Sequence, residues 1–284
     1  MAGSMKDIKL RIRSVQSTMQ ITKAMELVAS SKLRRAKERA EASRVYYQQV
    51  HQTLLEVAAH NTELTSPYAA ARERRRSCVI VIAGDRGLAG GFNHNLFKAV
   101  AASGEVDCVL PIGKKALDFY RRRGTEILSE EYAEAEHITI RDCHDIARFV
   151  CEKYLEGSFD TLSIAYTNFV SMLSQMPAVV KALPMLELEQ QENAQTDGRP
   201  RELTLYEPDS EAVFEQLIPH CIAGMLCGAV RESFASEQAA RRMAMDSASK
   251  NAGEMIAQLD LSYNRARQSA ITQEITEIVA GAEA

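Results

Sequence analysis

Several kinds of site are missing from this sequence of 284 residues. Its cysteines form no Cys-x-x-Cys pair, its histidines lack zinc-site spacing, and no Ser/His/Asp or paired-carboxylate set stands out. No stretch approaches the roughly 20 uncharged apolar residues of a membrane span, and the N-terminus lacks the apolar core of a signal peptide. We therefore expect a protein that stays in the cytoplasm or an equivalent compartment, with no catalytic residue, metal or cofactor of its own.

The cysteines lie mostly in apolar runs, where a free thiol behaves as a small core residue. We interpret them as reduced core thiols. Cys143, His144 and Asp145 offer three metal-ligating groups in a row, but adjacent residues on a helix point in different directions, which disfavours a metal site. The six are Cys78, Cys108, Cys143, Cys151, Cys221 and Cys227.

Proline and glycine are both absent between Ser4 and Ser66, and after Pro219 there is no further proline and glycine is sparse. These residues punctuate helices, so their absence predicts long helices at the two ends of the chain. We expect a long helix within residues 1–60, a compact domain with linkers in 61–208, and a second long helix within 209–284.

Both ends carry a coiled-coil seam. In the first, seam positions at alternating steps of four and three run from Ile8 to Val57 and are mostly apolar. Thr22 and Glu26 interrupt it, and a second apolar stripe appears there on another face, which predicts a change of buried face. Its members are Ile21, Ala24, Met25 and Val28.

The second seam runs from Met245 to Ala270 and is followed by more apolar residues up to Val279. Pro219 predicts a kink or a new helix start, and Gly281 ends the pattern as a C-cap would. Two long helices that flank a globular domain can pair antiparallel, so we expect the two ends to form one antiparallel coiled coil.

The middle of the chain alternates apolar runs with helical patterns, which is typical of a small open α/β sheet of the Rossmann-like kind. Residues 77–83 are continuously apolar, as a buried parallel strand would be. We expect strands at 77–83, 107–112, 125–128, 161–168 and 179–189, helices at 93–102, 114–123 and 141–155, and a polar surface loop at 190–202.

A glycine-rich segment, residues 84–91, follows the first strand, where phosphate-binding loops occur. It fits neither Gly-x-Gly-x-x-Gly nor Gly-x-x-x-x-Gly-Lys-Ser/Thr. A tight turn between strand and helix needs glycine for conformation alone. We interpret the segment as a structural or docking turn, with nucleotide binding as the alternative.

Charge is unevenly distributed. Residues 1–60 hold eleven Lys and Arg against five Asp and Glu, a balance of +6, whereas residues 185–215 hold nine acids against two Arg, a balance of −7. The basic end suggests an acidic partner, either protein or nucleic acid. Nucleic acid is the weaker choice, because the whole chain has a net charge of −4 and no known binding motif.

Three segments together closely resemble the γ subunits of F-type ATP synthases, in the right order and with a fitting overall length. They are residues 8–36, residues 85–93 (Asp85-Arg-Gly-Leu-Ala-Gly-Gly-Phe-Asn93) and residues 236–281, which include Tyr263-Asn-Arg-Ala-Arg-Gln-Ser-Ala-Ile271. Ala89 occupies a position at which many relatives carry Cys. A small side chain is sufficient at this position, so the difference does not weaken the resemblance.

The resemblance implies a rotating shaft, asymmetric and without a catalytic site, inside a ring of three α and three β subunits. It implies the ε subunit and the membrane c-ring as further partners, no nucleic acid, and a place on the cytoplasmic face of the cell membrane. The residues resembling coupling contacts to the α/β ring are Lys23, Met25, Arg241, Arg267, Gln268 and Thr272. Those resembling foot contacts to the c-ring and ε are Tyr206 and Glu207.

Two other classes of function remain open. A nucleotide-dependent enzyme explains only the α/β middle, and tight ATP binding by the isolated chain would favour it. A coiled-coil scaffold or nucleic-acid binder explains the helices and the basic face, and binding to duplex DNA that persists at moderate salt would favour it.

Overall fold

The computed structural model describes residues 5–60, 66–69, 76–185 and 206–282. They form two compact units, the two-helix unit (residues 1–31 with 241–284) and the sheet unit (residues 32–240). Two long helices, α1 (Met5–His60) and α6 (Ser210–Ala282), each run through both units. Long helices at both ends were predicted and are confirmed.

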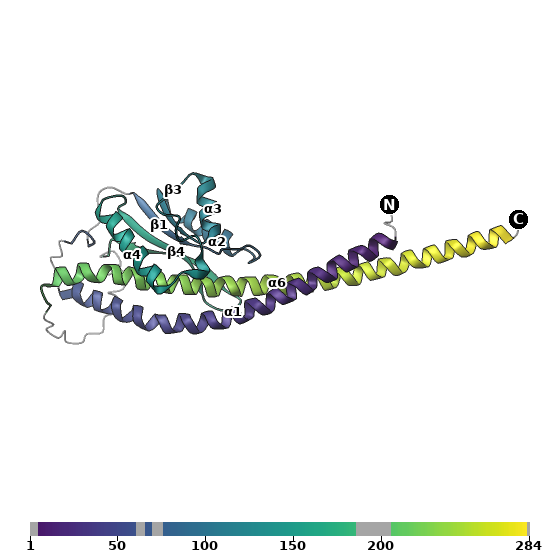
Figure 1. Cartoon of the computed structure of the whole chain (residues 1–284), viewed down its shortest axis with the longest axis horizontal. Coiled ribbons are helices and arrows are strands. Elements are labelled where there is room, and N and C mark those ends of the chain that lie inside the picture. The colour runs from purple at the N-terminus through teal and green to yellow at the C-terminus, as the bar shows by residue number, and fades with distance from the viewer. Residues whose placement is uncertain (1–4, 61–65, 70–75, 186–205, 283–284) are drawn as a thin grey trace. The chain divides into compact units, whose positions relative to one another are not determined.

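A five-stranded sheet in the order β3-β2-β1-β4-β5 forms the centre of the sheet unit (Figure 1). Four strands are parallel and β5 pairs antiparallel with β4 at one edge. The predicted α/β sheet is therefore confirmed. The strands are β1 (Ser77–Ile82), β2 (Cys108–Ile112), β3 (Glu126–Ile127), β4 (Thr161–Phe169) and β5 (Gln175–Leu183).

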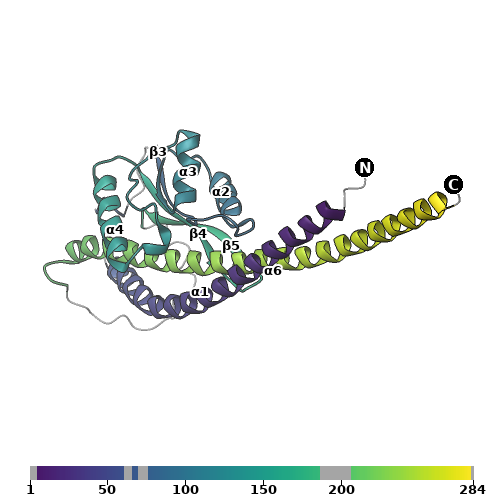
Figure 2. The same cartoon turned by 45° about the vertical axis from the view of Figure 1, so that its right-hand side comes forward.

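Helices cover both faces of the sheet because its central strands are apolar on both faces. On β1, Val79 and Val81 pack against α2 (Phe92–Ala102) and α3 (Lys114–Arg123). Ile80 and Ile82 pack on the other side against α4 (Ile140–Leu155) and the first part of α6. Figure 2 shows α2 and α3 on one side of the strands and α4 and α6 on the other.

The predicted strand at 179–189 is wrong in its position, because β5 spans Gln175–Leu183. This strand is only half-buried, and its apolar pattern is weak at the start. Pro177 has no backbone N–H to donate. It is tolerated because β5 is an edge strand of the described sheet and pairs there only with β4, so no strand on its other side needs that donor. The loop predicted at 190–202 lies outside the described residues.

α6 passes without interruption through Pro219, where a kink or a new start was predicted. Ile218, Cys221 and Ile222 beside it are fully buried in the sheet unit, and this packing outweighs the local preference of proline. At the other end, Gly281 lies within the last described turn and does not end α6, which reaches Ala282.

One stretch of α6 is also long and apolar enough to cross a membrane, with a mean hydropathy of 1.4 over its most apolar part, of which half is buried. The expectation that no stretch approaches this composition was therefore wrong. Phe214, Ile218 and Leu226 are fully buried against the sheet and α4. Packing in a protein core accounts for this apolar composition.

In the sheet unit, α1 meets α6 through small residues. Leu33 and Ala36 of α1 pack with Ala235 and Ala239 of α6, and all four are less than 5% exposed. Alanine lets two helices approach closely. The seam predicted on α1 is therefore present here, whereas on α6 it begins before Met245, where it was predicted to start.

In the two-helix unit, the seam passes through the position where it was predicted to fail. Thr22 is 9% exposed, and its Oγ1 lies 2.7 Å from Oγ of Ser249 on α6. Ile21 and Val28 of the second stripe are instead more than half exposed. The helix keeps one buried face, because the hydroxyl pair satisfies the polar groups that enter the seam.

The Thr22–Ser249 pair is expected to stabilise the two-helix unit. Thr22→Ala removes a buried cross-helix hydrogen bond, which contributes about 1 kcal/mol. Amides near Thr22 and Ser249 should then exchange hydrogen roughly fivefold faster. Thr18→Ala is the matched control, because Thr18 is exposed and its hydroxyl bonds only within α1. Equal exchange rates in the two variants would contradict a role for the pair.

Candidate functional site

The C-terminal part of α6 extends beyond the described start of α1 in the two-helix unit (Figure 1). The helices are antiparallel, and the contact between Thr22 and Ser249 places Met5 level with about residue 266. Ile275, Ile278 and Val279 are 57%, 71% and 53% exposed. An apolar helix end of this kind is stable when a partner surrounds it.

Three predicted coupling residues lie at the base of this projecting segment. Arg267, Gln268 and Thr272 are all exposed. Oγ1 of Thr272 donates a hydrogen bond to the carbonyl of Gln268 at 2.9 Å, so the two belong to one turn of α6. An arginine fork beside an exposed amide is suited to carboxylates or backbone carbonyls of another chain.

The other coupling residues lie elsewhere on the two-helix unit. Lys23 is exposed and Met25 half-buried on α1, beside the exposed Ile21 and Val28, and Arg241 is half-buried on α6. By the same register, Lys23 is level with about residue 248, roughly 29 Å along the helix from Arg267. The structure therefore spreads the six residues along the unit and does not gather them into one site.

The two predicted foot residues precede α6 in the sheet unit. Tyr206 is half-buried and packs against the main core, while Glu207 is exposed. The acidic residues between 186 and 205 lie outside the described residues. Asp209, close to both in the sequence, is also exposed.

The glycine-rich turn is held by Asp85, whose role was not predicted. Its carboxylate accepts hydrogen bonds from the backbone N–H groups of Lys114, Ala135 and Glu136, at 3.2, 2.9 and 3.0 Å. One of these donors begins α3, where a negative charge is favourable. The carboxylate thus joins the end of β1 to two later segments of the chain.

Backbone atoms lie too close to Gly113 for a side chain there. A Cβ atom at Gly113 would come within 2.2 Å of the carbonyl oxygen of Ala83, and its φ is +98°. A Cβ atom at Gly84 would come within 2.7 Å of Oε1 of Glu237 on α6, which is the end of a flexible side chain and can shift. The N–H of Gly84 donates to Oδ1 of Asn93 at 2.9 Å. These contacts support the structural interpretation of the turn over a phosphate cradle.

Residues 134–139 connect the turn to other elements through charged contacts. Lys114 Nζ lies 2.7 Å from Glu134, and Lys32 of α1 forms an ion pair with Glu136. Hydrogen bonds from these lysines lower the pKa values of both carboxyl groups. Thr139 and Asp142 then form a capping box at the start of α4, which lowers the pKa of Asp142.

Five of the six cysteines are buried, as predicted for core thiols, and Cys227 is half-buried. The imidazole rings of His144 and His220 meet edge to face, with their centroids 5.4 Å apart. Among the described residues, no group of three His, Cys, Asp or Glu side chains could hold a metal ion.

Comparison with known proteins places the whole chain in one family. A family model described as ATP synthase matches residues 4–284. The ATP synthase gamma chain of Ruminococcus albus is 47% identical over 283 residues, covering 97% of this chain and 96% of that protein. This chain belongs to the ATP synthase gamma chain family. The gamma chain of Alkaliphilus metalliredigens is 43% identical over 100% of this chain and 99% of its own length.

Solved structures share the fold of this γ subunit at lower identity. The Euglena gracilis mitochondrial ATP synthase rotor gives a TM-score of 0.66 at 21% identity, covering 94% of this chain and 98% of that one. The central stalk and c-ring structure from Tetrahymena thermophila gives 0.60 at 22% identity, covering 81% and 99%. Long paired terminal helices with a central α/β sheet are the shared fold.

The chain is therefore a non-catalytic subunit of ATP synthase, as its resemblance had implied. The polar cluster of Asp85 and its three backbone donors could be mistaken for a catalytic or binding site, but it has a structural explanation. What the structure presents for function is surface: an exposed apolar helix end and exposed basic and amide side chains along the two-helix unit.

Asp85 is expected to be a main stabilising residue of the sheet unit. Asp85→Ala leaves three backbone donors without their carboxylate, so the free energy of unfolding should fall by about 1–3 kcal/mol. Urea unfolding followed by circular dichroism measures this. Asp118→Ala removes an exposed carboxylate from α3 and should change stability by less than about 0.5 kcal/mol. Equal losses in both variants would rule out the bracing role.

Proposed function

We propose that this γ subunit is the rotating central shaft of a bacterial ATP synthase and couples ion flow through a membrane c-ring to ATP synthesis or hydrolysis on β subunits. The observation that carries the proposal is the two-helix unit with its projecting, apolar C-terminal segment. Such a segment needs a surrounding partner, and a ring of three α and three β subunits would supply one.

Structurally similar complexes support the proposed partners. One is a mitochondrial ATP synthase rotor, and another a central stalk with a c-ring. We assign Tyr206 and Glu207 to contacts with the c-ring and the ε subunit, since both precede α6 at the edge of the described sheet unit. The subunit would then belong to a peripheral complex on the cytoplasmic face of the cell membrane.

Coupling in this proposal is differential contact. A shaft that presents a different face to each β subunit stabilises a different conformation in each, and turning it shifts the three populations in sequence. The two-helix unit has unlike faces, because the exposed Lys23 and the exposed Ile21 and Val28 lie on different sides of α1. On this view Lys23, Met25 and Arg241 contact the ring lower on the shaft, and Arg267, Gln268 and Thr272 contact it near the tip.

Charge supports a protein partner with acidic loops. Lys6, Lys9, Arg11 and Arg13 are all exposed near the start of α1. Attraction between such a surface and acidic loops guides assembly and lessens as salt is added. Because the contacts are electrostatic and solvated, they can be exchanged at each step of rotation without a large desolvation cost.

Reconstitution tests the proposal directly. Purified α and β subunits are combined with and without this chain, and ATP hydrolysis is measured together with hydrolysis by the chain alone. We expect a stable complex with strong ATPase activity only when the chain is present, and none from the chain by itself. Failure to assemble, or hydrolysis by the isolated chain, would reopen the glycine-rich turn as a nucleotide site.

Arg267 and Gln268 test the assignment of the shaft tip. In the assembled complex, Arg267→Ala with Gln268→Ala should lower ATP-driven ion pumping by about fivefold, a typical coupling effect. Circular dichroism should stay unchanged, since both side chains are exposed. Arg265→Ala is the matched control, because it removes an exposed arginine from the side of α6 opposite Arg267. Normal ATPase activity and pumping in the double variant would exclude these two residues as coupling contacts.

A further inference from the structure

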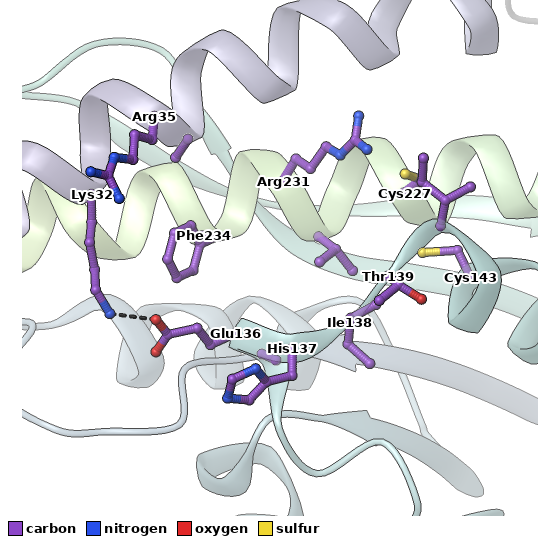
Figure 3. A pocket seen from close by; sticks show the side chains of 14 residues that line it. Lys32, Arg35, Glu136, His137, Ile138, Thr139, Cys143, Cys227, Arg231 and Phe234 are labelled. Carbon is purple, nitrogen blue, oxygen red and sulfur yellow. Dashed lines mark hydrogen bonds and ion pairs between the residues drawn. The ribbon is translucent and has the colours of Figure 1, made fainter.

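A pocket in the sheet unit has two thiols in its wall. Its volume is about 590 Å³, and it is bordered by α1, residues 135–140, α4 and α6. Cys143 comes from α4 and Cys227 from α6. Figure 3 shows the two side chains on neighbouring helices at one end of the pocket. Neither cysteine has a part in the proposed rotary function.

The two thiols interact with each other. Cys143 donates a hydrogen bond that stabilises the thiolate of Cys227, and with Arg231 nearby this lowers the pKa of Cys227 to about 7. The same hydrogen bond, together with burial, raises the pKa of Cys143. Of the two thiols, Cys227 is therefore the more readily ionised, and the thiolate is the reactive form of cysteine.

Access separates this pair from the other cysteines. Both cysteines border the pocket, but Cys227 is half-buried whereas Cys143 is only 1% exposed. Cys78 and Cys108 are also neighbours, being register partners on β1 and β2, but they are 1% and 0% exposed and lie within the sheet. A small reagent can therefore reach Cys227 first.

The lining of the pocket suits an anionic sulfur. Lys32, Arg35 and Arg231 contribute positive charge, and Glu136, which forms an ion pair with Lys32, contributes negative charge. A net positive surrounding favours a thiolate over a neutral thiol. The nucleophile, its hydrogen-bond donor and the route of entry are thus all in one place.

We propose that Cys143 and Cys227 form an oxidation-sensitive dithiol, which small peroxides entering the pocket convert to a disulfide that joins α4 to α6. Cys227 is the attacking cysteine and Cys143 the resolving one. The site takes a peroxide as its reactant and is distinct from every residue assigned above to rotary coupling.

The steps balance with hydrogen peroxide as the oxidant. The Cys227 thiolate attacks one peroxide oxygen, so an S–O bond forms, the O–O bond breaks, and the hydroxide that leaves takes up a proton to become water. The sulfur of Cys143 then attacks the sulfenic acid at Cys227. An S–S bond forms, the S–O bond breaks, and the thiol proton leaves with the hydroxyl as a second water. Two thiols lose two electrons and one peroxide is reduced to two waters.

The bond would fasten two elements that both cover one face of the sheet. Positions 143 and 227 are 84 residues apart, so the disulfide closes a long loop and restricts the unfolded chain. The oxidised protein should therefore melt at a higher temperature than the reduced one, and dithiothreitol should reverse the change. Oxidation would reversibly cross-link α4 to α6 within the sheet unit.

Peptide mapping of the full-length chain tests the proposal. The reduced chain is exposed to hydrogen peroxide under native conditions, alkylated, and digested without reductant. We expect a linked peptide that contains Cys143 and Cys227, loss of both alkylated thiols, and recovery with dithiothreitol. Before oxidation, Cys227 should be alkylated at least about tenfold faster than Cys221, which is fully buried on the same helix.

Variants identify the roles of the two sulfurs. Cys227→Ser should abolish the linked peptide, and Cys143→Ser should leave a sulfenic acid at Cys227 that dimedone traps. Cys221→Ser is the matched control and should form the disulfide normally. An oxidised chain without the linked peptide, or with Cys227 paired to another cysteine, would overturn the proposal. Because mapping of the unmodified chain needs no variant and no partner subunit, its outcome is independent of the rotary function.

Discussion

The antiparallel pairing of α1 and α6 is the constraint on which the rest of this molecule depends. In the two-helix unit the seam contains apolar residues, among them the buried Ala29, Met245 and Ala252, and it contains Thr22, which bonds to Ser249, 227 positions away. In the sheet unit it consists of alanines with Leu33. Small seam residues let the helices approach closely, and the single polar pair adds specificity of register, because a shifted register would bury hydroxyls without partners.

α6 has a second task in the sheet unit, since its first part is also a core helix. Phe214, Ile218 and Ile222 are fully buried there, and Glu237 reaches the glycine-rich turn at Gly84. Hydroxyl contacts add to this attachment, because Ser233 and Ser236 donate to the carbonyls of Ile82 and Thr167. Helix and sheet are therefore joined by packing and by directed bonds at the ends of β1 and β4.

A subunit without catalytic residues acts through the surfaces it presents. In this γ subunit, polar residues with several internal partners, such as Asp85, hold the sheet unit together, whereas Arg267 and Gln268 remain exposed on α6. In the proposed function, this division separates the residues that stabilise the fold from those that contact the ring. The proposed disulfide between Cys143 and Cys227 is separate from both groups. It would change the stability of the sheet unit without involving the projecting C-terminal part of α6.

Local sequence patterns were enough to predict the two long helices, their seams and the central strands, because helical period, strand period and the punctuation by glycine and proline are properties of neighbouring residues. The edge strand β5 was misplaced, since a half-buried strand that contains Pro177 has no strong pattern. The family motifs pointed to coupling residues, but their spread along the unit follows from the helix register. Only the tertiary structure decided that Thr22 stays in the seam, that Asp85 braces three segments, and that Cys143 meets Cys227. Each of these depends on a partner distant in the sequence. The side-chain type alone does not determine that partner, because folding of the chain brings the two residues together.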